Sequence, residues 1–322
     1  MNEFVIVVGF MLAAYSIIAN DSIQTLGTFL YSNRSRPWWL LCAYTSTILV
    51  VVIIAGYFLN GGTLEGGGDP SFGRLGRFEE NGLLDWRFLL PPIALLILTQ
   101  TGFPVSTSFL ILITFSPSAL LPMLEKSAMG YGVAFLLAII IYTLTKKLTD
   151  YFIRTQDKKP PLGWVIGQWI STGFLWSMWL MQDVANIFVY FPGSRDQIPF
   201  HWVLMGLGWM VIIQIIIYKV GGGRIQKIVK SKTSTGDIRA ATIVDFLYGI
   251  ILLYFKTLNN WPMSTTWVFV GLLAGRELGI VLTANNRPVK EVTTLILKDG
   301  GKMFVGLLVS VVIAFIVSDA SF

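Results

Sequence analysis

Long apolar runs separated by short polar loops dominate this chain. Four runs reach or approach the length of a helix that crosses a hydrocarbon core of about 30 Å: Trp38–Leu59, Tyr131–Thr145, His201–Tyr218 and Phe304–Val317. No strand-like alternation of apolar and polar positions prevails. Backbone groups in lipid must find hydrogen-bond partners within the protein, which helices provide. The pattern predicts an all-α polytopic membrane protein.

Two further apolar segments contain polar residues deep inside them. Glu3–Phe29 is interrupted at Asn20-Asp21, and Leu162–Phe191 is interrupted at Gln182-Asp183. We expect each segment to be a membrane helix that is broken at its polar residues.

Two other segments consist of short apolar arms around a proline. Phe88–Ser118 turns at Gly102-Phe103-Pro104, and Ala240–Ala274 turns at Asn260-Trp261-Pro262. Each arm of the first is short for a full crossing, and proline disfavours helix in the residue before it. Both segments are therefore predicted to be re-entrant helical hairpins.

The same order of elements occurs twice, in residues 1–150 and 151–322. The repeat keeps nearly one offset: Asp183 lies 183 − 21 = 162 residues after Asp21, and Ser264 lies 264 − 106 = 158 residues after Ser106. Three full crossings per half would insert the two halves with opposite orientations. Inverted repeats with broken helices are typical of secondary transporters.

Composition and charge support a membrane protein and give it an orientation. The chain is 54% hydrophobic and 13% charged, with a mean hydropathy of +0.67, whereas soluble proteins carry about 25% charged residues. With both termini outside, 18 of the 24 Lys and Arg residues fall in inside loops, five fall outside, and Lys256 lies in the second hairpin. This bias predicts a plasma (inner) membrane protein with outer termini. It also explains the basic pI without a nucleic-acid partner.

Asp21 and Asp183 are ionisable residues in apolar surroundings. Such a residue near the bilayer centre costs roughly 2.5–3.5 kcal/mol and is usually functional. Each has amide neighbours, and together they form a candidate set of hard oxygen ligands for a small coupling cation or a proton: Asn20, Asp21, Gln24, Gln182, Asp183 and Asn186. The alternative is that each aspartate caps a helix end at the interface.

A hydroxyl-rich triplet follows the turn of each hairpin. The triplets are Ser106, Thr107, Ser108 and Ser264, Thr265, Thr266. Hydroxyls and free N–H groups at a helix start bind anions, because that end of the helix dipole is positive. Hairpins entering from opposite faces would bring both triplets together near the membrane centre. The alternative is ordinary N-capping.

Four motifs in order, ANDSIQTLGT, PVSTS, QDVAN and PMSTTW, resemble the signatures of the inorganic phosphate transporter (PiT) family, and the likeness covers most of the chain. The resemblance implies import of inorganic phosphate, coupled to Na⁺ or H⁺, by alternating access. It also implies that the Asn/Asp segments and the hairpin hydroxyls hold the anion and the cations, with Asp21 and Asp183 as sodium ligands if sodium is the coupling ion. Phe109 and Trp267 stand where the family has histidine.

Several alternatives remain at this stage. A sulfate or other oxyanion permease would use the same donors. Lys256 either extends to the inner face or supplies a fixed positive charge near the anion. An enzyme acting on lipid-linked phosphates is disfavoured, because no nucleophile and base are suitably spaced and His201 is the only histidine. We expect no cofactor besides the coupling ion, and we leave a homodimer open.

Overall fold

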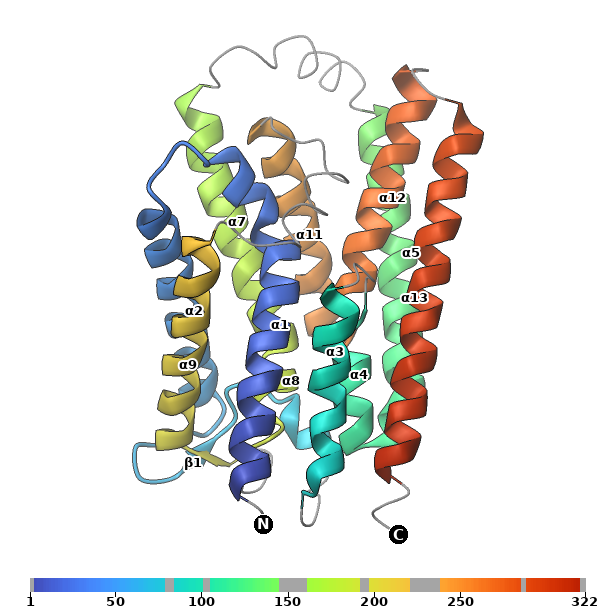
Figure 1. The fold of residues 1–322 in the computed structure, drawn as a ribbon. Coiled ribbons are helices and arrows are strands. Elements are labelled where there is room, and N and C mark those ends of the chain that lie inside the picture. The colour runs from blue at the N-terminus through green and yellow to red at the C-terminus, as the bar shows by residue number, and fades with distance from the viewer. Residues whose placement is uncertain are drawn as a thin grey trace.

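The computed structural model describes residues 3–78, 84–100, 105–144, 161–191, 197–220, 238–284 and 288–318; the side chains at positions 22–24, 99–100, 144, 240 and 284 are outside this description. The protein is a bundle of long helices (Figure 1). In the described part, seven helices are long and apolar enough to cross a membrane.

The described residues of the first half form five α-helices. They are α1 (Glu3–Ser32), α2 (Trp38–Leu59), α3 (Leu90–Gln100), α4 (Thr107–Phe115) and α5 (Leu120–Leu144). Short 3-10 turns precede or connect them: η1 (Leu75–Arg77), η2 (Trp86–Leu89) and η3 (Pro117–Ala119).

The second half repeats this order with longer hairpin arms. Its helices are α7 (Leu162–Asp183), α8 (Ala185–Phe188), α9 (Phe200–Lys219), α11 (Ile238–Leu258), α12 (Thr265–Ala284) and α13 (Val289–Ser318). Two short strands, β1 (Gly67–Gly68) and β2 (Ile198–Pro199), pair antiparallel with Gly67 opposite Pro199.

The two helix pairs α3–α4 and α11–α12 enter the bundle from opposite ends (Figure 1). The first pair extends from the end where α1 begins and α13 finishes, and the second pair comes from the other end. Both pairs turn back inside the bundle. The described part therefore contains two opposed helix pairs at the proline-centred segments, although the first turn, residues 101–104, lies outside it. The arms of the second pair are longer than a re-entrant hairpin requires, because α11 and α12 are each long and apolar enough to cross a membrane.

The helices form two groups that lie side by side (Figure 1). One group contains α1, α2, α7, α9 and α11, and the other contains α3, α4, α5, α12 and α13. The closest approach within the second group is between α5 and α12. A Cβ atom at Gly271 would lie 2.6 Å from the carbonyl oxygen of Tyr131, and one at Gly275 would lie 2.1 Å from that of Phe135. Small residues allow this backbone contact, as is usual between membrane helices.

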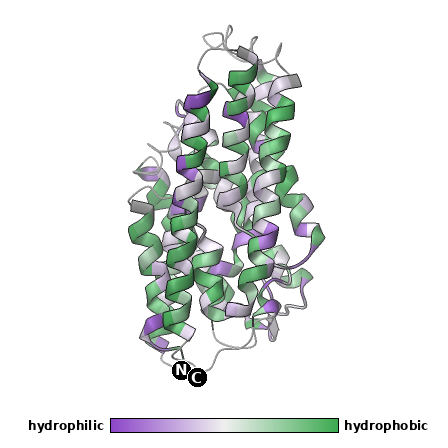
Figure 2. Cartoon of the chain, turned by 90° about the vertical axis from the view of Figure 1, so that its right-hand side faces the viewer, coloured by the Kyte–Doolittle hydropathy of each residue, from purple (hydrophilic) through white to green (hydrophobic). Residues whose placement is uncertain are grey.

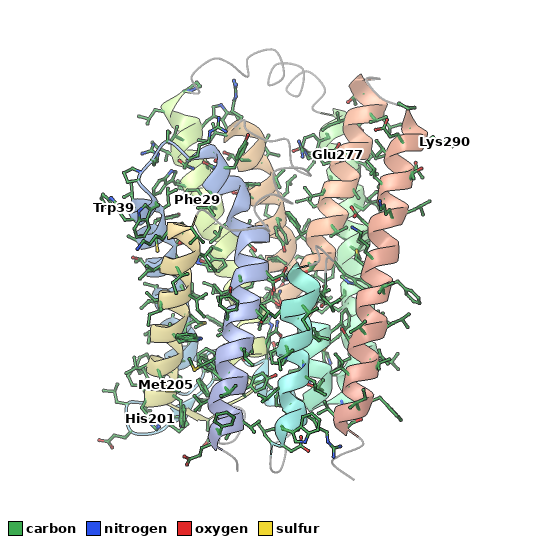
Figure 3. All side chains as sticks on the ribbon, in the orientation of Figure 1. Phe29, Trp39, His201, Met205, Glu277 and Lys290 are labelled. Atoms are coloured by element: carbon green, nitrogen blue, oxygen red, sulfur yellow. The ribbon has the colours of Figure 1, made fainter. Side chains whose placement is uncertain are left out.

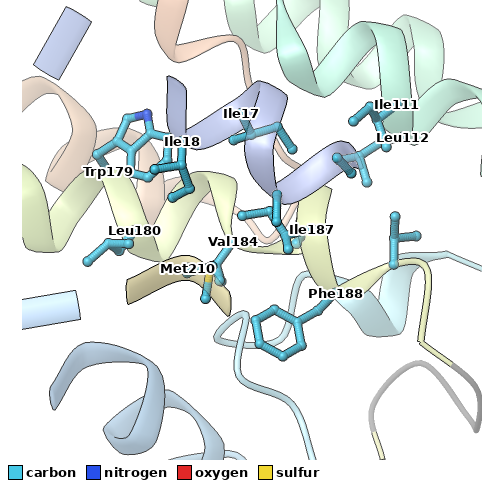
Figure 4. Packing of buried hydrophobic residues seen from close by; sticks show 14 of the residues in the cluster. Ile17, Ile18, Ile111, Leu112, Trp179, Leu180, Val184, Ile187, Phe188 and Met210 are labelled. Atoms are coloured by element: carbon cyan, nitrogen blue, oxygen red, sulfur yellow. The ribbon is translucent and has the colours of Figure 1, made fainter. Parts of the chain in front are cut away.

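Apolar side chains cover both the interior and much of the outer surface of the bundle. Figure 2 shows hydrophobic residues along the whole length of the helices, and large ones such as Val51, Ile170 and Phe315 are exposed. The interior cluster surrounds the junction of α7 and α8, where Trp179, Val184 and other apolar residues meet α1 and α4 (Figure 4). An apolar exterior around a packed interior is what a protein solvated by lipid requires.

The predicted break in the first helix is wrong, and the one in the second is confirmed. Helix α1 continues without interruption through Asn20 and Asp21. The Asp21 carboxylate does not compete for the helix backbone, because it accepts from the Thr107 hydroxyl at 2.8 Å and from the Asn20 amide at 2.6 Å. In the second half, α7 ends at Asp183 and α8 begins at Ala185.

Several predicted spans differ from the structure only at their ends. Trp38–Leu59 is reproduced as α2, and α9 is one residue longer at each end than predicted. The last helix begins at Val289 instead of Phe304. The apolar pattern missed its first turns because they carry exposed charged residues such as Lys290 and Lys298. Apolar runs identify the part of a helix in the hydrocarbon and miss its polar extension.

Candidate ion and anion site

Asp21 lies in the middle of the bundle with 1% of its surface exposed. Its Oδ2 atom accepts a 2.8 Å hydrogen bond from the hydroxyl of Thr107, in the first turn of α4. Its Oδ1 atom accepts a 2.6 Å bond from the Asn20 amide. The first carboxylate is therefore connected directly to the first hairpin.

Asp183 is fully buried at the end of α7 and contacts both hairpins. Its Oδ1 atom accepts from the Ser108 hydroxyl at 3.0 Å and from the Asn186 amide at 3.0 Å. Its Oδ2 atom accepts from the Thr265 hydroxyl at 2.6 Å. The interruption between α7 and α8 thus places a carboxylate and an amide beside two helix starts.

The first residue of each hydroxyl triplet is an N-cap. The oxygen of Ser106 accepts from the backbone N–H of Phe109 at 3.2 Å, and the oxygen of Ser264 accepts from that of Trp267 at 3.2 Å. The capping interpretation thus describes these two serines. The second and third residues of each triplet bond to groups outside their own helix instead.

The two hairpins exchange one hydrogen bond each. The Ser108 hydroxyl donates to the backbone carbonyl of Met263 at 3.2 Å, and the Thr266 hydroxyl donates to that of Val105 at 3.3 Å. Ser108 and Thr266 are 158 positions apart, as are Val105 and Met263. The predicted hydroxyl clusters therefore meet in the centre of the bundle, related by the sequence repeat.

Asn186 and Gln182 have different surroundings. The Asn186 amide also donates to Ser108 and Thr107, at 3.1 and 3.3 Å, while its carbonyl oxygen is buried without a hydrogen-bond partner in the described part of the chain. Gln182 accepts from the Arg74 guanidinium at 2.9 Å and donates to the Leu252 carbonyl at 3.0 Å. Asn186 thus offers an oxygen to a cation, while both polar ends of Gln182 are occupied. The Gln24 side chain lies outside the described residues.

Two basic residues that the charge count places on the outer side, Arg74 and Lys126, have buried side chains. Arg74 is 0% exposed and Lys126 is 1% exposed. The ammonium of Lys126 donates to the Asn259 carbonyl at 3.0 Å, the Asn259 side chain at 2.9 Å and the Trp261 carbonyl at 2.6 Å. It fixes the tip of the second hairpin to α5. Arg74 occurs in a Gly-rich polar stretch that gives no sign of burial, whereas Lys126 lies within the apolar stretch Pro117–Thr143 and could have been noticed there.

Burial lowers the pKa of the Arg74 guanidinium to about 10, and the carboxylates of Asp183 and Asp69 oppose this shift. The side chain therefore remains charged at neutral pH. A fixed positive charge lies near the carboxylate of Asp183.

Another buried carboxylate, Asp245, was also missed. It lies on α11 and accepts from the hydroxyls of Thr28 at 2.7 Å and Thr172 at 2.6 Å. The signal that identifies it is a single acidic residue within the apolar stretch that forms α11. It connects three helices at a point separate from Asp21 and Asp183.

Lys256 lies two residues before the end of α11, at the tip of the hairpin. Its ammonium is 5.2 Å from the centre of the Phe72 ring. It therefore contacts the segment after α2, away from the end of the bundle at which α11 begins. This position favours a fixed charge near the tip over a side chain that extends to the inner face.

No protein-family model matches the chain, and no curated protein matches it. A search of solved structures identifies a similar fold in "The sodium-dependent phosphate transporter", with a TM-score of 0.64 and 16% sequence identity. The similarity covers 100% of this chain and 98% of the other. The resemblance inferred from the four motifs is thereby confirmed at the level of the fold.

Proposed function

We propose that this protein is an ion-coupled symporter that imports inorganic phosphate by alternating access. The observation that carries the proposal is the meeting of both hairpin hydroxyl clusters with Asp21 and Asp183 in the centre of the bundle. The shared fold with a sodium-dependent phosphate transporter supports it. The same similarity of fold favours a transporter over an enzyme.

The hydrogen bonds of the site suggest how ion and anion binding are coupled. The hydroxyls of Thr107 and Thr265 donate to carboxylates here, and a hydroxyl has one hydrogen to donate. An oxyanion that accepts these hydrogens must compete with the carboxylates. A cation or proton on Asp21 and Asp183 removes that competition and also the charge repulsion. We therefore propose that coupling ions bind before, or together with, the anion.

The oxygens available to a cation are of the hard type that sodium prefers. They include the carboxylates of Asp21 and Asp183 and the carbonyl oxygen of Asn186. The hydroxyl oxygens of Thr107 and Thr265 lie within 3 Å of these carboxylates and complete a mixed ligand set. The sodium dependence of the structurally similar protein favours sodium over a proton as the coupling ion.

Residues 1–150 and 151–322 are proposed to be inverted repeats. The order of helices is the same in both, and the hairpins enter from opposite ends (Figure 1). The hydrogen bonds exchanged between Ser108, Met263, Thr266 and Val105 follow the same repeat. Such symmetry is the usual basis for two alternative states that open to opposite sides of a membrane.

Uptake into proteoliposomes tests the proposal. Purified protein is reconstituted, and radiolabelled phosphate is added under an inward sodium gradient, an inward proton gradient or no gradient. Accumulation that requires the sodium gradient supports the proposal with sodium as the coupling ion. Accumulation that requires the proton gradient supports phosphate symport with a proton as the coupling ion. Radiolabelled sulfate in a parallel experiment distinguishes the anions: if sulfate is accumulated and phosphate is not, the protein is a sulfate or other oxyanion permease.

A further inference from the structure

We propose that Arg74 is an anion-binding residue of the central site, presented by the segment Asp69–Phe78 that follows α2. This inference rests on the proposed function and adds a recognition element to it. The sequence motifs do not include this arginine, which lies in the Gly-rich segment between α2 and η1.

The segment that presents Arg74 has a defined conformation. Asp69 accepts hydrogen bonds from the backbone and hydroxyl of Ser71 and from the backbone N–H of Gly73, and the Ser71 hydroxyl accepts from the N–H of Leu75 at 2.9 Å. Phe72 has a φ of 59°, which is uncommon for a bulky residue. Such a backbone is held only where the surrounding contacts determine it. The turn formed by residues 69–73 fixes the direction in which the side chain of Arg74 leaves the backbone.

The same segment contacts the tip of the second hairpin. The Phe72 ring lies under the Lys256 ammonium, and the Arg77 guanidinium lies 5.6 Å from the centre of the Trp261 ring. A Cβ atom at Gly73 would lie 3.0 Å from the side-chain nitrogen of Asn260. Arg74 therefore enters the bundle where the hairpin tip and the end of α7 come together.

Arg74 itself has an unmet hydrogen-bonding requirement. Its Nη2 atom donates to Gln182 at 2.9 Å, and Nη1 makes only a long 3.5 Å contact to the Ser71 carbonyl. Its Nε–H is buried and has no acceptor among the described residues. Within that same part of the chain, no carboxylate lies at ion-pair distance from it. A buried charge with an unused donor is costly unless a ligand completes it.

An oxyanion supplies the acceptor that Arg74 lacks. Guanidinium groups bind phosphate through parallel N–H donors in a fixed fork, and such bonds are stronger than those between neutral groups. Gln182 adjoins Asp183, so the bond from Arg74 to Gln182 holds the guanidinium beside the central carboxylate. Lys126 is a poorer candidate, because its three contacts with Asn259 and Trp261 account for its three donors.

The simpler alternative is that Arg74 only balances the charge of Asp183. Direct phosphate binding by purified protein separates the two interpretations. We compare wild type, Arg74→Gln, Arg74→Lys and the control Arg87→Gln, using radiolabelled phosphate in saturating sodium and thermal denaturation in parallel. Arg87 lies in the same connection but pairs with the exposed Asp85 at 3.5 Å, and it has no contact with the hairpin tip.

Arg74→Gln is expected to weaken phosphate affinity by roughly ten- to a hundredfold, as for loss of a charged hydrogen bond. Arg74→Lys should weaken it several-fold, since a point charge replaces the fork, and Arg87→Gln should leave it unchanged. Wild-type affinity in a folded Arg74→Gln protein would overturn the inference and leave the transporter proposal intact. If Arg74→Gln does not fold, wild-type affinity in Arg74→Lys overturns it. If wild type binds no phosphate, the proposed function fails, and this inference fails with it.

Discussion

The Thr265 hydroxyl lies 2.6 Å from the Oδ2 atom of Asp183 and donates its hydrogen to it. The first half of the chain contains the same pair, in which Thr107 donates to Asp21 at 2.8 Å. A hairpin hydroxyl thus meets a membrane-embedded carboxylate twice, as the duplicated sequence would require. This pairing is the basis of the proposed coupling, because the same hydrogens are needed for the anion.

Removing either hydroxyl should weaken anion binding without damaging the fold. Thr107→Val or Thr265→Val keeps the side-chain shape and deletes a donor to a charged group, which is worth about 1.5–3 kcal/mol. The half-saturating phosphate concentration for uptake should rise roughly ten- to a hundredfold. The control is Thr47→Val, since Thr47 is exposed on α2 and bonds only its own helix. Unchanged half-saturation in both variants would limit the hairpin hydroxyls to a structural role.

Neutralising either central carboxylate should abolish gradient-driven uptake. Asp21→Asn and Asp183→Asn preserve size but remove the charge that a coupling cation or proton requires. Uptake under a sodium gradient is expected to fall to the level of protein-free liposomes. Glu125→Gln is the matched control, because Glu125 is exposed on α5. Normal transport with unchanged ion dependence in both aspartate variants would contradict the assignment.

The contact between α5 and α12 should not accept a larger residue. Gly275→Ala places a methyl group 2.1 Å from the Phe135 carbonyl oxygen, and overpacking of this kind typically costs about 1–3 kcal/mol. The melting temperature in detergent should fall by several degrees. Gly132→Ala should leave it unchanged, because a Cβ at Gly132 meets nothing within 4 Å. Equal melting temperatures for the two variants would mean that the helices separate freely.

The orientation predicted from charge is testable with two single cysteines. Leu64 is 72% exposed near β1, and β1 pairs with β2, which lies just before His201. Lys290 lies at the opposite end of the bundle from His201 (Figure 3). In a Cys42→Ala background, an impermeant thiol reagent applied from outside should label Leu64→Cys, whereas Lys290→Cys should react only after permeabilisation. Labelling of both from outside would refute the orientation with outer termini.

The sequence predicted the parts of the fold that depend on local hydrophobicity. The α2 span is an uninterrupted apolar run and was predicted to the residue. The two helix pairs followed from proline within apolar segments, although α11 and α12 are longer than predicted, and the hydroxyl and carboxylate residues followed from their duplication. These features are properties of a few neighbouring residues or of a repeat that is visible in the chain.

Other features depend on partners far away in the sequence. Asn20 and Asp21 were expected to break α1, yet the helix continues, and the Asp21 carboxylate is bonded by Thr107, 86 positions away. Arg74 and Lys126 were placed on the outer side by the charge count, which says nothing of their buried contacts. Their acceptors, Gln182 and Asn259, are 108 and 133 positions away, and no pattern along the chain connects them.

The grouping of helices has a consequence for how the chain is assembled. Helix α5 packs on α12, and α13 packs on α4, so elements from each half complete the partner half's hairpin (Figure 1). Early in synthesis, α4 has no α13 to cover it, and α5 has no α12. Neither helix can complete its packing until nearly the whole chain has been inserted. The two halves are therefore interlocked, and the step that unites them comes at the end of biosynthesis, when the final helix arrives.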